Sequence, residues 1–161
     1  MRVLVTGASG FVGNSLCSHL VGKDFFVVGV VRSLPEKPLP GVDYRVIESL
    51  NNDSKWRGVL VGVDAVIHCA ARAHVMRDQE EDPLEVFREV NVKGTVCIAQ
   101  QAADIGVKRF VYLSSVKVNG ESTDNHPFRS DDPPAPEDPY GVSKWEAEMA
   151  LKKLSQKAEL E

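Results

Sequence analysis

The stretch that decides the fold opens the chain: Val3-Leu4-Val5, followed at once by Thr6-Gly7-Ala8-Ser9-Gly10-Phe11-Val12-Gly13. A short apolar run bounded by glycine is typical of a buried strand. Apolar residues then recur at helical spacing, so a helix is expected to begin near Gly10 or Phe11. Those residues are Val12, Leu16 and Leu20. The stretch therefore predicts a strand, a glycine turn and a helix in direct succession.

The three glycines have the spacing G-x-x-G-x-x-G, and each has a physical role in a dinucleotide-binding turn. Gly7 can take a positive φ, Gly10 lets a phosphate approach the backbone, and Gly13 lets the helix lie close to the strand. The free N–H groups of the helix would face that phosphate. An ordinary strand–helix turn is the alternative, but the strand before and the helix after favour a dinucleotide site. No Gly-Lys-Ser/Thr follows, so the turn is not a P-loop.

The composition is that of a globular protein with one domain. The 161 residues are 43% hydrophobic and 26% charged, with a net charge of -4. The lack of a long basic run argues against a nucleic-acid surface. No apolar stretch approaches the roughly 20 residues of a membrane span. Because Met1-Arg2 leads straight into the first strand, no signal peptide and a cytoplasmic location are expected. Cys17, Cys69 and Cys97 are expected to be buried thiols, without a metal or a disulfide.

Alternating apolar runs and helical segments predict an α/β fold, a Rossmann-like doubly wound parallel sheet with helices on both faces. The further strands are expected at Phe25–Val31, Tyr44–Ile47, Ala65–His68 and Phe110–Leu113. The further helices are expected as a short one capped by Asp53, a long one over Asp82–Ile105 and a last one from Pro139 to about Lys157.

The end of the second strand bears on the choice of cofactor. An acidic residue here would hold the ribose diol of NAD, but the strand ends in Val31-Arg32-Ser33. Arg32 could accommodate the 2′-phosphate of NADP, stack on adenine, or be a solvated loop residue. This tips the expectation slightly towards NADP, and the predicted cofactor stays NAD or NADP.

Two further positions are expected to support the site. Ala70 and Ala71 follow a strand whose carboxyl end would line the ligand crevice, so they are expected to let the cofactor approach. Plain tight packing is the alternative. Asn91 lies within a predicted helix, where a polar residue is mildly unfavourable. It is expected to bond to a neighbouring strand or to bulged backbone, with a simple exposed residue as the alternative.

Tyr140 and Lys144 are four residues apart in the first turns of a predicted helix, so they share a face. A tyrosine ordinarily has a pKa of about 10, and a nearby ammonium favours the phenolate. Tyr140 would exchange a proton with a substrate hydroxyl while hydride moves to or from a nicotinamide. Ser115, beyond a strand end, would hydrogen-bond the same oxygen, and Lys144 would also reach the nicotinamide ribose. A chance surface pair is the alternative.

Five segments resemble the extended short-chain dehydrogenase/reductase family, and within it the NAD-dependent epimerase/dehydratase branch. The resemblance implies that Ser115, Tyr140 and Lys144 are catalytic, with Ser115 chosen over Ser114 because it lies five before Gly120. Dehydratases of the branch carry Asp-Glu after this serine, where Val116-Lys117 stands, so the chain looks most like bacterial UDP-sugar 4-epimerases of surface-polysaccharide pathways. The segments are Thr6–Gly13, His68–Ala71, Asn91–Thr95, Ser114–Gly120 and Pro139–Lys144.

The resemblance also implies a UDP-linked nucleotide-sugar substrate, inverted at C4 by transient hydride transfer to bound NAD(P)+. Lys117 stands where these epimerases usually have Ser or Thr, and Asn119 where they have Tyr. Lys117 is expected either to touch a sugar or diphosphate, or to point to solvent. The expected cofactor contacts are Gly7, Ser9, Gly10, Phe11, Val12, Gly13, Arg32, Ser49, Leu50, Ala70, Ala71, Asn91, Tyr140 and Lys144.

Members of this family are longer, with a further strand and a C-terminal sugar-nucleotide domain. Residues 1–161 are therefore expected to be a truncated NAD(P)-binding Rossmann domain that binds cofactor with little or no turnover. The resemblance implies a homodimer through the 82–105 and 139–157 helices, with Leu151 and Leu154 in that contact or in the protein's own core. The rival functions are an NAD(P)H-dependent reductase and a non-catalytic NAD(P)-sensing or assembly protein.

Overall fold

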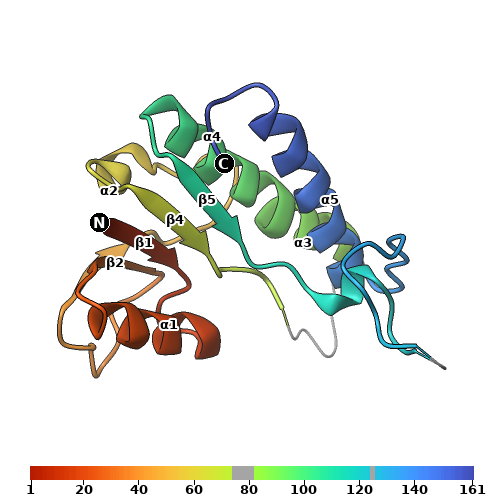
Figure 1. Ribbon diagram of the computed structural model, residues 1–161, viewed down its shortest axis with the longest axis horizontal. Helices are drawn as coiled ribbons and strands as arrows, with labels where there is room; N and C mark the ends of the chain where they lie inside the picture. Colours follow the sequence, from red (N-terminus) through yellow and green to blue (C-terminus); the bar gives the residue numbers. More distant parts are fainter. Residues whose placement is uncertain (74–81, 124–125) are drawn as a thin grey trace.

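The computed structural model of the chain describes residues 1–73, 82–123 and 126–161. One sheet of five parallel strands crosses the molecule in the order β3-β2-β1-β4-β5 (Figure 1). The chain winds outward from β1 in one direction and then, from β4, in the other, which confirms the predicted doubly wound fold. The strands are β1 (Arg2–Thr6), β2 (Phe26–Val31), β3 (Val42–Val46), β4 (Ala65–His68) and β5 (Arg109–Tyr112).

Helices cover both faces of the sheet. Figure 1 shows α1 on one side and α4 and α5 on the other. Among the described residues, no helix is both long enough and apolar enough to cross a membrane. The helices are α1 (Phe11–Val21), α2 (Arg57–Leu60), α3 (Pro83–Arg88), α4 (Thr95–Asp104) and α5 (Pro139–Ser155), with a π-helical turn η1 (Glu89–Gly94) and a 3-10 turn η2 (Val116–Val118).

The core has two halves, one on each face of the sheet. Val3 and Val5 of β1 point towards α1, whereas Leu4 points towards the side where Trp56 and Ile98 pack. Successive residues of a strand face opposite sides, so a strand buried on both faces reads as an unbroken apolar run. This explains why β1 and β2 were the easiest strands to predict.

Two helices differ from the sequence-based expectation. Asp53 does not cap α2: its own N–H donates to Asn51 Oδ1 at 3.0 Å, and α2 begins later, with Trp56 as the N-cap residue. The predicted 82–105 helix begins as expected, because Asp82 accepts a hydrogen bond from Glu85 N, but it is interrupted by the π-helical turn η1. A π turn inside a helix often marks a functional site.

The last residues lie alongside β5. Phe110 N–H donates to Glu161 O at 2.7 Å, and Glu161 N–H donates to Lys108 O at 3.1 Å. This is the hydrogen-bond pattern of two parallel strands. Leu151 and Leu154 of α5 pack with Leu160 against the protein's own core. This was one of the two positions predicted for these leucines.

Candidate functional site

The glycine turn is built by close approach of the backbone to itself. Gly7 has a φ of +66°, and a Cβ on Gly13 would lie 2.2 Å from Gly7 O. Gly10 N–H donates to Gly7 O at 2.9 Å. The start of α1 is thus pressed against the end of β1, as Gly7 and Gly13 were predicted to allow. A side chain at either position would force the two elements apart.

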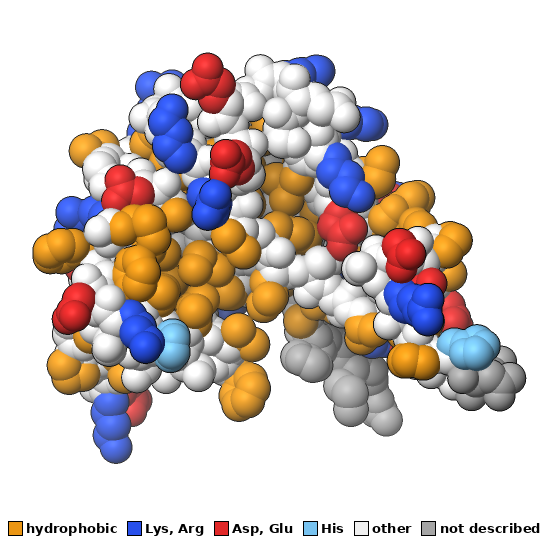
Figure 2. Space-filling model, viewed as in Figure 1, with side chains coloured by type: hydrophobic (Ala, Val, Ile, Leu, Met, Phe, Trp, Pro, Cys, Tyr) orange, Lys and Arg blue, Asp and Glu red, His pale blue; other side chains and the backbone are white. Residues whose placement is uncertain are grey.

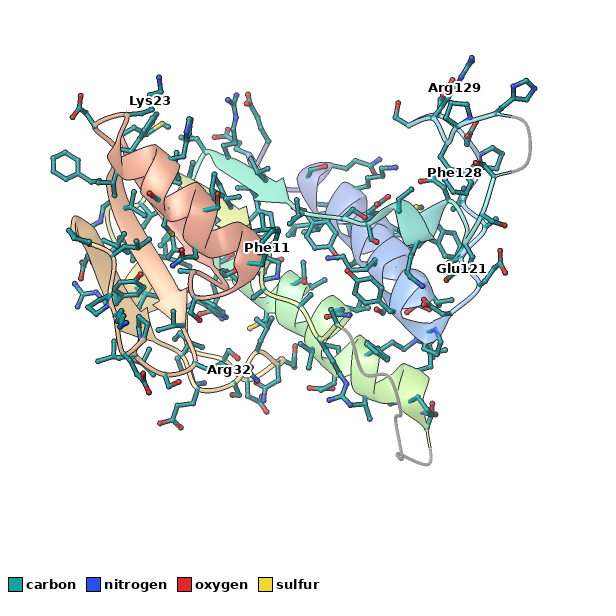
Figure 3. All side chains as sticks on the ribbon, turned by 90° about the horizontal axis from the view of Figure 1, so that it is seen from below. Phe11, Lys23, Arg32, Glu121, Phe128 and Arg129 are labelled. Carbon is teal, nitrogen blue, oxygen red and sulfur yellow. The ribbon has the colours of Figure 1, made fainter. Side chains whose placement is uncertain are left out.

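The N-terminus of α1 is open. Gly10 is its N-cap residue, and none of the described side chains caps it. Ser9 is exposed and Phe11 is 96% exposed. In Figure 3 Phe11 marks the start of α1. The first N–H groups of a helix need partners, and a phosphate is a suitable one. Val12 is also exposed. Contact of these residues with a cofactor stays a prediction.

A buried histidine joins the ends of β1 and β4 to α4. His68 Nδ1 lies 2.8 Å from Thr6 Oγ1, and its Nε2 lies 3.0 Å from Thr95 Oγ1. Burial, and then the charge of Lys144, lower the pKa of His68 to about 3, so the ring is neutral at ordinary pH. A polar residue at the end of a buried strand is itself a sign of such a network, but its partners Thr6 and Thr95 were not predicted.

The small residues after β4 pack against the glycine turn. A Cβ on Gly7 would lie 3.0 Å from Ala70 N, and Ala70 N–H donates to Thr6 Oγ1 at 3.1 Å. Tight packing, one of the two alternatives for Ala70, is therefore present. Whether Ala70 and Ala71 also contact a cofactor stays a prediction.

Asn91 links the chain after β4 to the start of α5. It is 1% exposed; its Oδ1 accepts from Arg72 N at 2.7 Å, and its Nδ2 donates to Arg72 O and to Ser143 Oγ. Ser143 Oγ in turn donates to Tyr140 O at 2.7 Å. The expected bond to neighbouring backbone is thus confirmed, and the exposed alternative is wrong. Ser143 was not anticipated.

The first turn of α5 is fixed by its cap and by α3. Asp138 Oδ1 accepts from Gly141 N at 2.6 Å, as the Asp-Pro start predicts. The half-buried Tyr140 meets the Phe87 ring edge-on at 6.2 Å. One turn later, Arg88 of α3 forms a two-bond ion pair with Glu146, at 2.8 and 2.6 Å. The first two turns of the helix that carries Tyr140 are therefore held in place.

Lys144 is a buried ammonium. It is 2% exposed, its Nζ donates to Leu113 O at 2.6 Å, and Nζ lies 4.0 Å from the centre of the Tyr112 ring. Burial lowers the pKa of Lys144 to about 8, although the charges of Glu148 and Cys69 oppose this. A lysine that titrates near neutrality is typical of functional sites.

The two serines after β5 have different surroundings. Ser114 Oγ donates to the Glu148 carboxylate of α5. Ser115 is the N-cap residue of η2, and its Oγ accepts from Lys117 N at 3.3 Å. Ser114 is thus engaged with α5, whereas Ser115 retains a hydroxyl proton for another acceptor. The choice of Ser115 as the catalytic serine stays a prediction.

Lys117 does not simply point to solvent, one of the two alternatives, while its contact with a sugar or diphosphate stays a prediction. Its Nζ donates to Glu121 Oε1 at 2.6 Å and to Asp138 Oδ2 at 2.7 Å. The ammonium therefore joins the segment after β5 to the residue that caps α5. Glu121 lies only four residues after Lys117, whereas Asp138 lies 21 residues away along an irregular connection, so no local pattern pointed to it.

The remaining predicted cofactor residues follow β2 and β3, at the carboxyl ends of these strands. Arg32 is exposed after β2, as labelled in Figure 3. Ser49 O accepts from Ser54 Oγ at 2.7 Å, and Leu50 packs against Gly94, where a Cβ would lie 2.7 Å from Leu50 Cγ. Figure 2 shows the surface hollowed between the body of the molecule and the lobe that carries η2. The roles of these residues stay predictions.

Known proteins match this sequence along nearly its whole length. Residues 3–161 match the NAD dependent epimerase/dehydratase family. The UDP-glucose 4-epimerase of Vibrio cholerae is 46% identical over 161 residues, which cover 99% of this chain and 48% of that protein.

Solved structures agree in fold. A short-chain dehydrogenase/reductase superfamily protein from Agrobacterium tumefaciens with bound NAD has a TM-score of 0.84 at 28% identity, over 100% of this chain and 47% of its own. MoeE5 in complex with UDP-glucose and NAD has a TM-score of 0.82 at 32% identity, over 99% and 52%. The chain spans about half the length of these relatives. Residues 3–161 match the family, and the glycine turn and the doubly wound sheet agree with that match. The chain therefore belongs to the NAD dependent epimerase/dehydratase family.

Proposed function

We propose that residues 1–161 hold NAD on the glycine turn and supply the catalytic groups of a nucleotide-sugar 4-epimerase. The substrate would be a UDP-linked hexose, inverted at C4 without net oxidation. The observation that carries the proposal is the 46% identity with a UDP-glucose 4-epimerase. It is supported by the position of Tyr140 and Lys144 on one helix, α5, that packs beside β5.

The residues at the glycine turn fit a dinucleotide. The uncapped N-terminus of α1 offers N–H groups to a pyrophosphate, and Gly13 keeps that end clear of side-chain atoms. We take NAD as the cofactor because the solved relatives contain it. When bound, it would accept a hydride from the sugar and give it back.

The chain's own residues would move the proton. Tyr140 would take the proton of the C4 hydroxyl and later return it to the same oxygen. Ser115 would donate a hydrogen bond to that oxygen and keep it aligned. Lys144, four residues later on the same face of α5, would hold the nicotinamide ribose. Because the hydride would return to C4 and the proton to the C4 oxygen, no net redox change would result.

The decisive experiment joins residues 1–161 to the C-terminal half of a relative and measures epimerase activity. Residues 1–161 are fused to the remaining half of the Vibrio cholerae protein, and conversion of UDP-glucose into its C4 epimer is measured without added NADH. We expect turnover from the fusion, none from residues 1–161 alone, and a loss of about 100-fold or more for Tyr140→Phe. A folded fusion that forms no epimer, and that consumes NADH in a second assay to which NADH is added, would favour a reductase and overturn the proposal.

A further inference from the structure

We propose that Lys117 is a positioning residue, which holds the segment carrying Ser115 against the first turn of α5, which carries Tyr140. The inference rests on the proposed function, because that function assigns both hydroxyls to the same substrate oxygen. The sequence-based expectation for Lys117 was contact with substrate or with solvent. Its position between the two predicted catalytic segments gives it another role.

The lysine reaches both segments with different atoms. Its backbone N–H donates to Ser115 Oγ at 3.3 Å, while its Nζ donates to Asp138 Oδ2 at 2.7 Å. Ser115 lies two residues before Lys117, and Asp138 lies two residues before Tyr140. The two segments that carry the predicted catalytic hydroxyls are therefore connected through a single residue.

The backbones also touch at this point. A Cβ on Gly141 would lie 2.6 Å from Lys117 O, so η2 lies directly against the first turn of α5. Such an approach needs an attractive contact to keep it closed, and the ion pair lies beside it. Pairs in which both groups are charged form the stronger hydrogen bonds of proteins.

The two carboxylate oxygens of Asp138 accept hydrogen bonds from different groups. Oδ1 accepts from Gly141 N and caps α5, while Oδ2 accepts from Lys117. Loss of the ammonium would therefore release η2 and leave the helix cap in place. Because the Lys117 and Asp138 side chains are 37% and 35% exposed, solvent screens the pair and it adds little to global stability. Its effect is expected in local geometry rather than in global stability.

Two further hydrogen bonds lie in the connection between η2 and α5. Ala135 N–H donates to Val118 O at 2.9 Å, and Glu121 gives the ammonium its second carboxylate. Figure 3 shows Glu121 close to α5, with Phe128 and Arg129 farther out along the connection. The ammonium thus lies at the base of this connection, where a change is transmitted to both Ser115 and Tyr140.

The test observes Tyr140 directly in residues 1–161. The chain has three tyrosines, so incorporation of 3-fluorotyrosine gives three ¹⁹F NMR signals, and Tyr140→Phe identifies the one of interest. Lys117→Met keeps the length of the side chain and removes its charge. We expect it to shift or broaden the Tyr140 signal, to leave the Tyr44 signal unchanged, and to speed amide exchange at residues 116–121 and 140–142 about tenfold.

Three variants sharpen the result. Lys117→Arg keeps a cation and should restore the wild-type Tyr140 signal. Asp138→Asn keeps the cap acceptor and should reproduce the effect of Lys117→Met. Lys93→Met is the matched control, because Lys93 also bridges two carboxylates, Glu85 and Glu89, at 2.8 and 2.9 Å. It should leave the Tyr140 signal as in the wild type.

An unchanged Tyr140 signal in Lys117→Met, an equal response to Lys93→Met, or a parallel change of all three tyrosine signals would each overturn the proposal. The proposed function is read separately, by titration of NAD into the same samples. Lys117→Met should bind NAD within about twofold of the wild type, since the glycine turn lies on other elements. A wild-type chain that fails to bind NAD would contradict the proposed function, while the Tyr140 signal would still decide the role of Lys117.

Discussion

At the scale of single residues, the site contains two ionisable groups that burial has moved far from their ordinary behaviour. Lys144 is 2% exposed and His68 is fully buried. Burial disfavours the charged form of each, so it lowers the pKa of both. The lysine is left able to titrate near neutral pH, whereas the histidine is left neutral. Both shifts make the stability of the fold depend on pH.

Lys144→Met should relieve a pH-dependent cost. The pKa of Lys144 falls from 10.5 to about 8 on folding, so between these values the unfolded chain binds more protons and stability rises with pH. The free energy of unfolding of the variant minus that of the wild type should therefore be about 3 kcal/mol larger at pH 7 than at pH 10.5. Urea unfolding at the two pH values measures this. A constant difference between the two proteins would contradict the assignment.

His68→Gln should reduce acid sensitivity. Because burial lowers the pKa of His68 from 6.5 to about 3, the unfolded chain binds an extra proton between these values. Stability contributed by the neutral ring is complete above pH 6.5 and is lost as the pH falls towards 3. The wild type should lose about 2–3 kcal/mol more than the variant between pH 7 and pH 4.5. Denaturant unfolding tests this, with the exposed His126→Gln as a control that behaves as the wild type.

At the scale of elements, strand, turn and helix were predictable where a local pattern suffices. The apolar run of β1 and the glycine spacing predicted β1 and α1, and Asp138-Pro139 predicted the start of α5. The π-helical turn η1 was not predictable, because it is associated with a contact distant in sequence, between Asn91 and Arg72. The pairing of Lys117 with Asp138, 21 residues away, was missed for the same reason. Local periodicity carries no information about which distant side chains will meet.

Gly13→Ala should damage the junction of β1 and α1. The new Cβ would lie 2.2 Å from Gly7 O, so the helix must shift, at a cost of about 1–3 kcal/mol. NAD affinity, measured by calorimetry, should fall by about 100-fold or more, since the N–H groups of α1 would move away from the phosphates. Gly22→Ala is the matched control, because its Cβ would meet His19 O at an ordinary 3.5 Å. Equal NAD affinity in both variants would contradict the proposed position of the cofactor.

At the scale of the whole molecule, the family and the fold were predictable, and the roles of the site residues are still predictions. The doubly wound sheet and family membership follow the sequence closely. Arg32 shows the limit of sequence reasoning: its exposed position fits both a nucleotide contact and a solvated residue. The choice between NAD and NADP depends on such peripheral contacts, which a strand pattern does not encode.

Cofactor binding should stabilise the whole chain. A ligand that binds only the folded state adds about 2.7 kcal/mol at 100 times its Kd. We therefore expect NAD to raise the Tm of residues 1–161 and NADP to raise it less, with no rise for Gly13→Ala. Thermal unfolding monitored by circular dichroism measures this. A larger rise with NADP would instead assign Arg32 to a 2′-phosphate.

The connection between η2 and α5 has a practical consequence. Its two ends are joined by the bonds of Lys117 and Val118, while Arg129 and Asp132 form a separate exposed turn farther out. Doubling the length of a flexible loop costs only about 0.6 kcal/mol. A fluorescent peptide grafted into that turn is therefore expected to leave the rest of the fold undisturbed, and would provide a label with which to follow ligand binding.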